Sequence, residues 1–152
     1  MEQLVNFFYR LLDRYAGFTQ MRYLYDEINW KNQLILIRGP KGSGKTTMLM
    51  QHILRTFPDK SKVLYCSVDH FWFASHTLLD LAEYAYTHDI THLFLDEIHK
   101  YGNWAQELKN IYDGYPKLHV VVTGSNALDI IHQMYDLSRR CRVYTMHGMS
   151  FR

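Results

Sequence analysis

The chain has 152 residues, of which 47% are hydrophobic, and a formal net charge of +2 when its histidines are neutral. This composition excludes an intrinsically disordered chain, and no apolar run approaches the length of a membrane span. So small a charge gives no argument of its own for nucleic-acid binding, and the length fits one domain with a hydrophobic core.

Periodicity predicts helices that alternate with short apolar strands. In chain order, the predicted elements are a helix over 2–14, a helix that starts after Thr19, strand 33–39, helix 45–56, strand 62–69, a helix from Thr77 through Tyr86, strand 91–96, a helix that starts near Asn103 and ends at Gly114, strand 117–124, a helix near 127–135 and a strand near 142–147. Such an alternation predicts a parallel sheet covered by helices on both faces.

Two of these helices carry sequence signals at their starts. Thr77 and Asp80 form a capping-box pattern, and Asn103 is expected to cap the helix that follows it. Ligands on parallel sheets lie at the carboxyl ends of the strands, and the unusual residues of this chain follow those ends.

The cysteine and histidine patterns give no metal site. Cys66 and Cys141 are far apart in the sequence, and His88, His92 and His99 match no zinc pattern. The N-terminus, MEQLVNFFYRLLDR, lacks the pattern of a signal peptide. These features predict a reduced, cytoplasmic protein.

The first predicted strand runs into GPKGSGKT, which matches the phosphate-binding pattern G-x-x-x-x-G-K-[ST] at every fixed position. Gly42 and Gly44 allow the backbone to fold around phosphates, and the helix that follows adds its positive end. The pattern assigns Lys45 to the β- and γ-phosphates of ATP and Thr46 to Mg²⁺. A chance glycine-rich turn is the alternative, but the flanking strand and helix are the context that the motif requires. The predicted nucleotide-binding residues are Gly39, Pro40, Lys41, Gly42, Ser43, Gly44, Lys45, Thr46 and Thr47.

Two acids, Asp96 and Glu97, end the apolar stretch LFLDE. Carboxylates are costly to bury unless a cation meets them. The phosphate loop upstream places this strand end near the nucleotide, so Asp96 is predicted to hold Mg²⁺ through its water shell and Glu97 to orient the attacking water. A solvated acidic strand end is the alternative.

Polar residues end the fourth strand in the run TGSNA, residues 123–127. Asn126 is the first candidate for a side chain that senses the γ-phosphate, followed by Ser125 or Thr123; a plain helix N-cap is an equally good interpretation. Further on, SRRCR (138–142) places three arginines before the last strand. They form either a solvated basic edge or an arginine finger for a neighbouring subunit.

Four segments carry a family resemblance: LILIRGPKGSGKTTML, LFLDEIHKYGNWAQELKNIYDGYP, VVVTGSNA and the closing HGMSFR. With them, nearly the whole chain resembles the AAA-type branch of P-loop ATPases, and more narrowly a prokaryotic family described as predicted AAA+ superfamily ATPases. That family pairs this core with a C-terminal domain of uncertain role. The resemblance implies a three-layer αβα P-loop NTPase fold with about five parallel strands, a central P-loop strand and two preceding helices.

The resemblance also implies roles for single residues. Asp96 and Glu97 are the metal and water acids, and the region Ser125–Asn126 is the sensor. By the spacing of the wider AAA group, Arg140 is the nearest match to an arginine finger, and Arg139 is next. The implied catalytic set is Lys45, Glu97, Asn126 and Arg140, with ATP and Mg²⁺ as cofactors.

AAA modules normally continue into a helical lid that closes over the nucleotide, whereas this chain stops at Arg152. We therefore expect one AAA-type core over 1–152, with N-terminal helices in 1–32, the P-loop core in 33–152 and no lid. A missing lid bears on turnover more than on nucleotide binding. A second departure is Lys41, which stands where many relatives have an arginine.

Three functions compete. Mg²⁺-dependent ATP hydrolysis coupled to a conformational change leads. A small-molecule kinase is second, but no acceptor pocket or arginine-bearing lid is evident, and the acid pair favours water as the acceptor. The third is a non-hydrolysing switch or nucleic-acid-associated module, in which Phe71, Trp72 and Phe73 stack on bases rather than pack beneath a loop. A homo-oligomer through the arginine-bearing edge is expected, and the protein or nucleic-acid target stays open.

Overall fold

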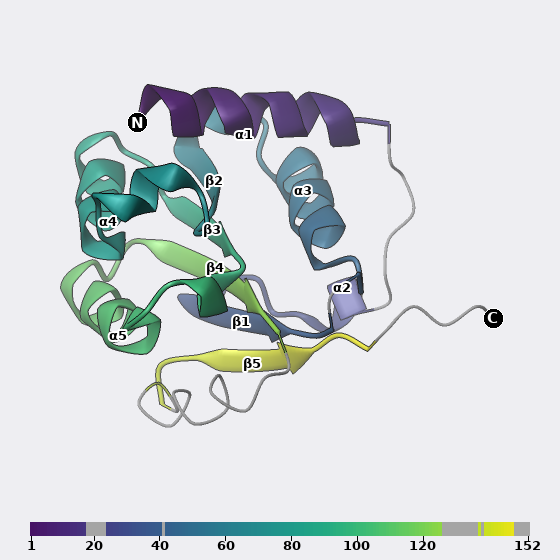
Figure 1. The fold of residues 1–152 in the computed structure, drawn as a ribbon. Coiled ribbons are helices and arrows are strands. Elements are labelled where there is room, and N and C mark those ends of the chain that lie inside the picture. Colours follow the sequence, from purple (N-terminus) through teal and green to yellow (C-terminus); the bar gives the residue numbers. More distant parts are fainter. Residues whose placement is uncertain (18–23, 41, 126–136, 138, 148–152) are drawn as a thin grey trace.

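The computed structural model describes residues 1–17, 24–40, 42–125, 137 and 139–147. Five parallel strands form one sheet in the order β2-β3-β4-β1-β5 (Figure 1). The strands are β1 (Leu34–Arg38), β2 (Val63–Ser67), β3 (His92–Asp96), β4 (His119–Gly124) and β5 (Arg142–Thr145). The strand before the phosphate loop, β1, is therefore interior, with β4 and β5 as its neighbours.

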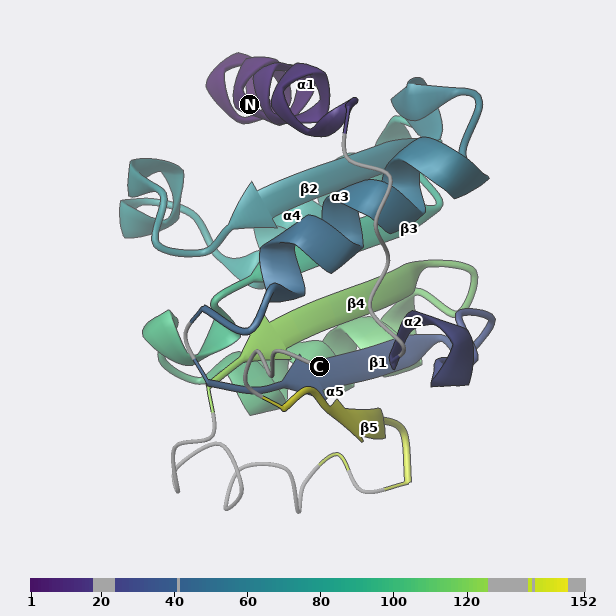
Figure 2. The ribbon, with the colours of Figure 1, turned by 90° about the vertical axis from the view of Figure 1, so that its right-hand side faces the viewer.

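Helices cover both faces of this sheet. They are α1 (Glu2–Tyr15), α2 (Leu24–Glu27), α3 (Lys45–Thr56), α4 (Leu78–Thr87) and α5 (Trp104–Gly114). Figures 1 and 2 show α3 on one face and the neighbouring helices α4 and α5 on the other. The long helix α1 lies against the edge strand β2 and against α3. The predicted three-layer α/β architecture is confirmed.

The strands are apolar because helices cover them from both sides, which removes the polar alternation of a half-exposed sheet. Residues Leu34 to Ile37 of β1 are at most 2% exposed. On α3, Met48, Leu49, Met50 and Ile53 are fully buried in the core. The core thus fixes β1 and α3 on either side of the phosphate loop.

Of the two predicted helix-start signals, the capping box is confirmed, whereas the side-chain cap expected at Asn103 does not form. The capping box of α4 is present, since Asp80 N donates to Thr77 Oγ1 and Thr77 N donates to Asp80 Oδ2. Asn103 precedes α5 but makes no side-chain cap hydrogen bond. Its φ of 55° is left-handed, whereas a capping residue needs the β region to aim its side chain at the first turn. The helix predicted near 127–135 lies outside the described residues.

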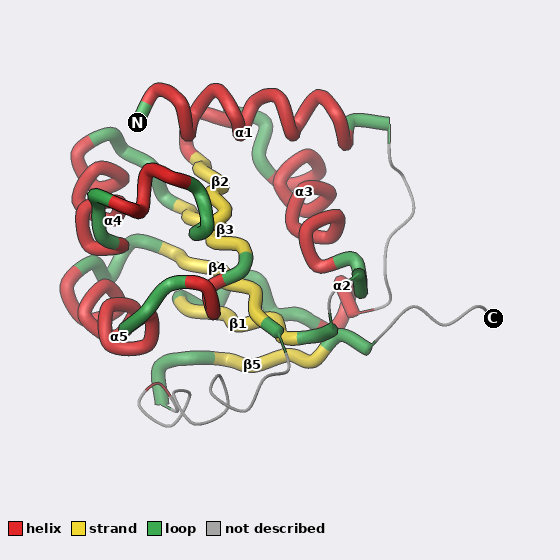
Figure 3. The backbone as a smooth tube through the Cα atoms, in the orientation of Figure 1, coloured by secondary structure: helices red, strands yellow, loops and turns green. Residues whose placement is uncertain are grey.

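The carboxyl ends of β1, β3 and β4 lie together at one end of the sheet, as the tube in Figure 3 makes visible. Arg38 pairs with Gly124, and Leu95 pairs with Val122. This register brings the phosphate loop after β1, the acids at the end of β3 and the polar end of β4 together.

Candidate nucleotide-binding site

The phosphate loop follows β1 and turns directly into α3. Gly42 and Gly44 have φ of 81° and 91°, which is left-handed backbone that glycine adopts without a steric penalty. Gly44 is the N-cap of α3, so the helix starts at Lys45. Backbone N–H groups at this helix start have no partner within the helix and are suited to bind phosphate. Lys41 lies outside the described residues.

Gly39 is required by close packing. A Cβ added there would stand 2.5 Å from the backbone oxygen of Met146 and 3.1 Å from Ser43 Oγ. Met146 N donates to Arg38 O at 2.7 Å, so the segment after β5 is fixed against the start of the loop. The first glycine of the motif therefore lets the residue after β5 pack directly against the start of the loop.

We expect Gly39→Ala to lower the free energy of unfolding by about 1–3 kcal/mol, because the methyl group overpacks a backbone contact. Gly102→Ala is the matched control, since a Cβ at Gly102 meets nothing within 4 Å. Urea unfolding of both variants measures the difference. Equal stability of the two variants would contradict the close contact with Met146.

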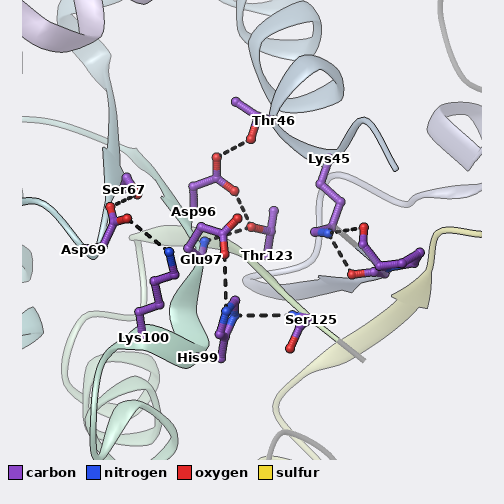
Figure 4. A network of polar contacts seen from close by, with 12 residues as sticks. Lys45, Thr46, Ser67, Asp69, Asp96, Glu97, His99, Lys100, Thr123 and Ser125 are labelled. Carbon is purple, nitrogen blue, oxygen red and sulfur yellow. Dashed lines mark hydrogen bonds and ion pairs between the residues drawn. The ribbon is translucent and has the colours of Figure 1, made fainter. Parts of the chain in front are cut away.

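Lys45 is held inside the loop by oxygen atoms of the loop itself (Figure 4). Its Nζ donates to Gly39 O at 2.7 Å, to Pro40 O at 3.0 Å and to Ser43 Oγ at 3.4 Å. Burial lowers the pKa of Lys45, and the charges of Glu97 and Asp96 act in the opposite direction. The ammonium group is therefore held among the oxygen atoms of the loop, where a phosphate would offer it anionic oxygens.

Asp96 is buried and accepts hydrogen bonds from three hydroxyl groups. Thr46 Oγ1 and the Tyr65 hydroxyl each donate to Oδ2 at 2.5 Å, and Thr123 Oγ1 donates to Oδ1. Burial, and after it the Asp96 charge, raise the pKa of Tyr65, so its hydroxyl remains a donor. These three donors offset the cost of burying the carboxylate.

Tyr65 is a member of the site that the sequence analysis missed. Ser67 pairs with Asp96 across the β2–β3 ladder, and Tyr65 is two residues before Ser67, on the same face of the sheet. A usable signal was present, because a buried tyrosine in an apolar strand needs a partner for its hydroxyl.

Thr123 joins the two acids. Its hydroxyl donates to Asp96 and accepts from Glu97 N at 3.0 Å. Thr123, one of the predicted sensor candidates, thus contacts both acids through its side chain. Asn126, the first candidate, lies outside the described residues, and Ser125 donates through its backbone N to His99 Nδ1 at 3.3 Å.

Thr123→Val is expected to lower the free energy of unfolding by about 1–3 kcal/mol, because it leaves a buried acceptor on Asp96 and the Glu97 N–H without their partner. Thr87→Val serves as the control, since Thr87 is exposed at the end of α4 and its hydroxyl contacts only its local neighbours there, Tyr84 O and His88 Nδ1. Thermal and urea unfolding compare the two. A Thr123→Val variant as stable as the control would show that this bridge contributes nothing to folding.

Glu97 has left-handed backbone, with φ of 63°. Its carboxylate oxygen Oε2 lies 3.3 Å from His99 Nε2, and the Glu97 side chain is 33% exposed. Asp96, in contrast, is 3% exposed. The two neighbouring acids therefore differ: one is enclosed by hydroxyl groups, and the other is open to water.

The oxygen groups present fit a magnesium ion that shares its ligands with phosphate. Thr46 and Asp96 supply a hydroxyl and a carboxylate, which are the hard ligands that Mg²⁺ prefers. Within the described residues, no three His, Cys, Asp or Glu side chains are grouped to hold a metal ion. A metal at Thr46 and Asp96 would therefore take further ligands from phosphate oxygens and water.

Arg140 and the aromatic run Phe71–Phe73 have contacts of their own. Arg140 Nε donates to Asp113 Oδ1 at 2.9 Å, which ties the arginine to α5 of the same chain.

Trp72 is buried and stacks on His76 with ring centroids 4.1 Å apart, whereas Phe71 is 65% exposed. Packing thus accounts for Trp72 and leaves Phe71 on the surface.

No described helix is long and apolar enough to cross a membrane.

Comparison with known sequences finds one family over most of the chain. A family model described as an AAA domain matches residues 31–152. The uncharacterized protein MJ1637 of Methanocaldococcus jannaschii is 37% identical over 134 residues, which cover 82% of this chain. The match spans only 28% of the length of that relative.

Solved structures share the fold at low sequence identity. AMPPCP-bound DnaA from Aquifex aeolicus matches 91% of this chain and 45% of its own, with a TM-score of 0.52 and 15% identity. PCH-2 of C. elegans matches 97% and 42%, with a TM-score of 0.52 and 17% identity. Katanin, in a structure that concerns its self-assembly, matches 76% and 41%, with a TM-score of 0.53 and 20% identity.

Proposed function

Because this chain belongs to the AAA domain family, we propose that its P-loop core binds ATP with Mg²⁺ and hydrolyses the γ-phosphate, and that hydrolysis drives a conformational change. The family supports nucleotide binding and ATPase activity in general; the metal and the hydrolytic step are specific to this proposal. Lys45 contacts the phosphates, Thr46 and Asp96 hold the metal, and Glu97 orients the water. Bound Mg²⁺ would neutralise charge on the phosphates.

The contact between Thr46 and Asp96 carries this proposal. The two residues are 50 positions apart, yet Thr46 Oγ1 lies 2.5 Å from Asp96 Oδ2. A glycine-rich turn that matched the phosphate motif by chance would give no reason for its threonine to meet an acid of another strand. The contact between the hydroxyl of Thr46, which follows Lys45 in the sequence, and the Asp96 carboxylate supports a site shared by metal and phosphate.

Phosphate release from ATP tests the proposal, with Mg²⁺ varied and with candidate small-molecule acceptors and DNA added in separate reactions. We expect release that requires Mg²⁺, with no acceptor phosphorylated. A phosphorylated acceptor would support the kinase instead. ATP binding without any release would favour the nucleotide switch, and DNA bound in an ATP-dependent manner would favour its nucleic-acid form. Mg²⁺ titrated without nucleotide is expected to bind poorly.

The arginine-bearing edge supports an assembly of several copies as part of the same proposal. Arg140 is paired with Asp113, but the two side chains are 30% and 50% exposed. An ion pair this exposed to water contributes little to stability, so a neighbouring subunit's nucleotide can compete for the arginine. The two buried free cysteines, Cys66 and Cys141, support a reducing, cytoplasmic setting.

Arg140→Ala is expected to leave ATP affinity nearly unchanged and to slow turnover by up to about a thousandfold, the effect of arginine fingers elsewhere. The rate per molecule of the parent should also rise with protein concentration. Arg142→Ala, at an exposed position of β5, is the control. A rate per molecule that does not change with concentration, together with full activity of Arg140→Ala, would support the solvated-edge interpretation.

A further inference from the structure

His99 lies between the proposed catalytic glutamate and the end of β4. Its Nε2 is 3.3 Å from Glu97 Oε2, and its Nδ1 accepts from Ser125 N at 3.3 Å (Figure 4). We propose that His99 is a positioning residue that orients the Glu97 carboxylate for hydrolysis and links it to the segment after β4. This inference rests on the proposed function, because it assigns the orientation of the group that acts on water.

The tautomer of His99 follows from its two partners. The backbone N–H of Ser125 is always a donor, so Nδ1 must be the unprotonated nitrogen that accepts from it. In a neutral imidazole the proton then resides on Nε2, which faces Glu97. The ring therefore presents its N–H toward a carboxylate oxygen 3.3 Å away, while the backbone N–H of Ser125 engages its other nitrogen.

Such a donor prepares Glu97 for its proposed role. His99 Nε2 lies 3.3 Å from Oε2, which leaves Oε1 to accept from a water molecule. A base whose orientation is set by a third group is a recurring arrangement in catalytic sites. The Glu97 side chain is 33% exposed, so water reaches it, whereas its own rotation is restricted by the ring.

The backbone makes this contact possible. Left-handed φ at Glu97 starts the short 3-10 turn Ile98–Lys100, and the turn brings the side chains of Glu97 and His99 to the same side. Thr123 Oγ1 fixes the Glu97 N–H at 3.0 Å. The glutamate is thus held through its backbone by β4 and through its carboxylate by His99.

A plain surface ion pair is the competing interpretation. Exposed pairs contribute little and hold no fixed geometry. His99, however, is 23% exposed, and its second nitrogen is engaged by a backbone donor. A ring held at both nitrogens resembles the outer partners that orient ligands and bases in enzyme sites, whose loss typically lowers activity by about 10- to 100-fold.

The kinetic test compares His99→Ala with His99→Gln, whose amide retains both a donor and an acceptor. We expect His99→Ala to lower kcat about 10- to 100-fold with little change in KM for ATP, and His99→Gln to restore part of the loss. His88→Ala, at an exposed histidine at the end of α4, is the control. In a Glu97→Gln background, His99→Ala should add no further loss, because His99 acts through that carboxylate. Full activity of His99→Ala, or an undiminished further loss in that background, would overturn the inference.

A spectroscopic readout separates this inference from the proposed function. Long-range ¹H–¹⁵N spectra of the full chain are expected to show His99 with Nε2 protonated and Nδ1 unprotonated, and the Nε2 resonance should move in Glu97→Gln. A His99 ring protonated on Nδ1, or an Nε2 resonance that does not respond to Glu97→Gln, would overturn the positioning role whether or not ATP is hydrolysed. A parent that shows the expected spectra but releases no phosphate would contradict the proposed function while supporting the contact.

Discussion

Replacement of Lys45 by alanine is expected to lower the affinity for ATP by roughly 10- to 100-fold, the range for lost hydrogen bonds to charged groups. The ammonium group is already inside the loop, 2.7 Å from Gly39 O, so the parent needs no large rearrangement to bring it to a phosphate. Alanine removes the cation but leaves the left-handed glycines and the start of α3 in place. Calorimetric titration with a non-hydrolysable ATP analogue measures the loss.

The fold should survive this change. Lys45 donates to the carbonyl groups of Gly39 and Pro40, and Pro40 is exposed, so water can replace part of these contacts at a cost of about 1 kcal/mol. Lys117→Ala is the matched control, because Lys117 is exposed before β4, at the other end of the sheet. Equal ATP affinity in both variants would refute the assignment of the phosphate loop.

The order and type of the elements were predictable because the sequence alternates between two periods. Apolar runs of four or five residues mark the strands, and a 3.6-residue period marks the helices. The bounds predicted for α3, 45–56, agree with those in the structure, Lys45–Thr56. Gly44 interrupts the helical pattern directly before Lys45, and Pro58 ends it shortly after Thr56. Local chemistry therefore fixes both ends of the helix.

The phosphate loop and the acid pair were predictable for a related reason. Each is a short local pattern whose chemistry depends on neighbours in the sequence. Asn103 shows the limit of this reasoning, since its residue type is right for a cap but its left-handed φ of 55° is not. Propensity describes what a side chain can do, whereas the backbone angle decides where that side chain points.

The hydroxyl groups around Asp96 depend on strand order, which no local pattern encodes. Tyr65 reaches Asp96 because β2 pairs with β3, and Thr123 reaches it because β4 lies on the other side of β3. The position of His99 depends in turn on the left-handed backbone of Glu97. The sequence therefore predicts the groups that the site needs, but the register of the sheet decides which further residues support them.

Glu97→Gln is expected to bind ATP about as tightly as the parent and to lose about 10²- to 10⁴-fold in phosphate release, the range for general acid–base groups. Glutamine keeps the size of the side chain, and its amide oxygen can still face His99 Nε2. It removes the negative charge that polarises water. Because the Glu97 side chain is partly exposed and is not enclosed by hydroxyl groups, the free energy of unfolding should change little.

Asp96→Asn should behave differently from Glu97→Gln in two measurements. Titration with ATP at varied Mg²⁺ should show a loss of the Mg²⁺-dependent part of binding, because a charge beside Thr46 is removed. Urea unfolding should show a loss of about 1–3 kcal/mol, because the amide presents a donor to hydroxyl groups that donate to Asp96 in the parent.

The contrast between these two variants follows from the environment of each acid. Asp96 accepts from Thr46, Tyr65 and Thr123, so its replacement disturbs both the metal site and the core. The Glu97 side chain is partly exposed and lies beside His99, so its replacement should disturb only the reaction. Equal losses of stability and of binding in both variants would mean that the acids share one structural role. Full phosphate release by Glu97→Gln would remove the catalytic glutamate from the mechanism and leave the nucleotide switch as the better account of this site.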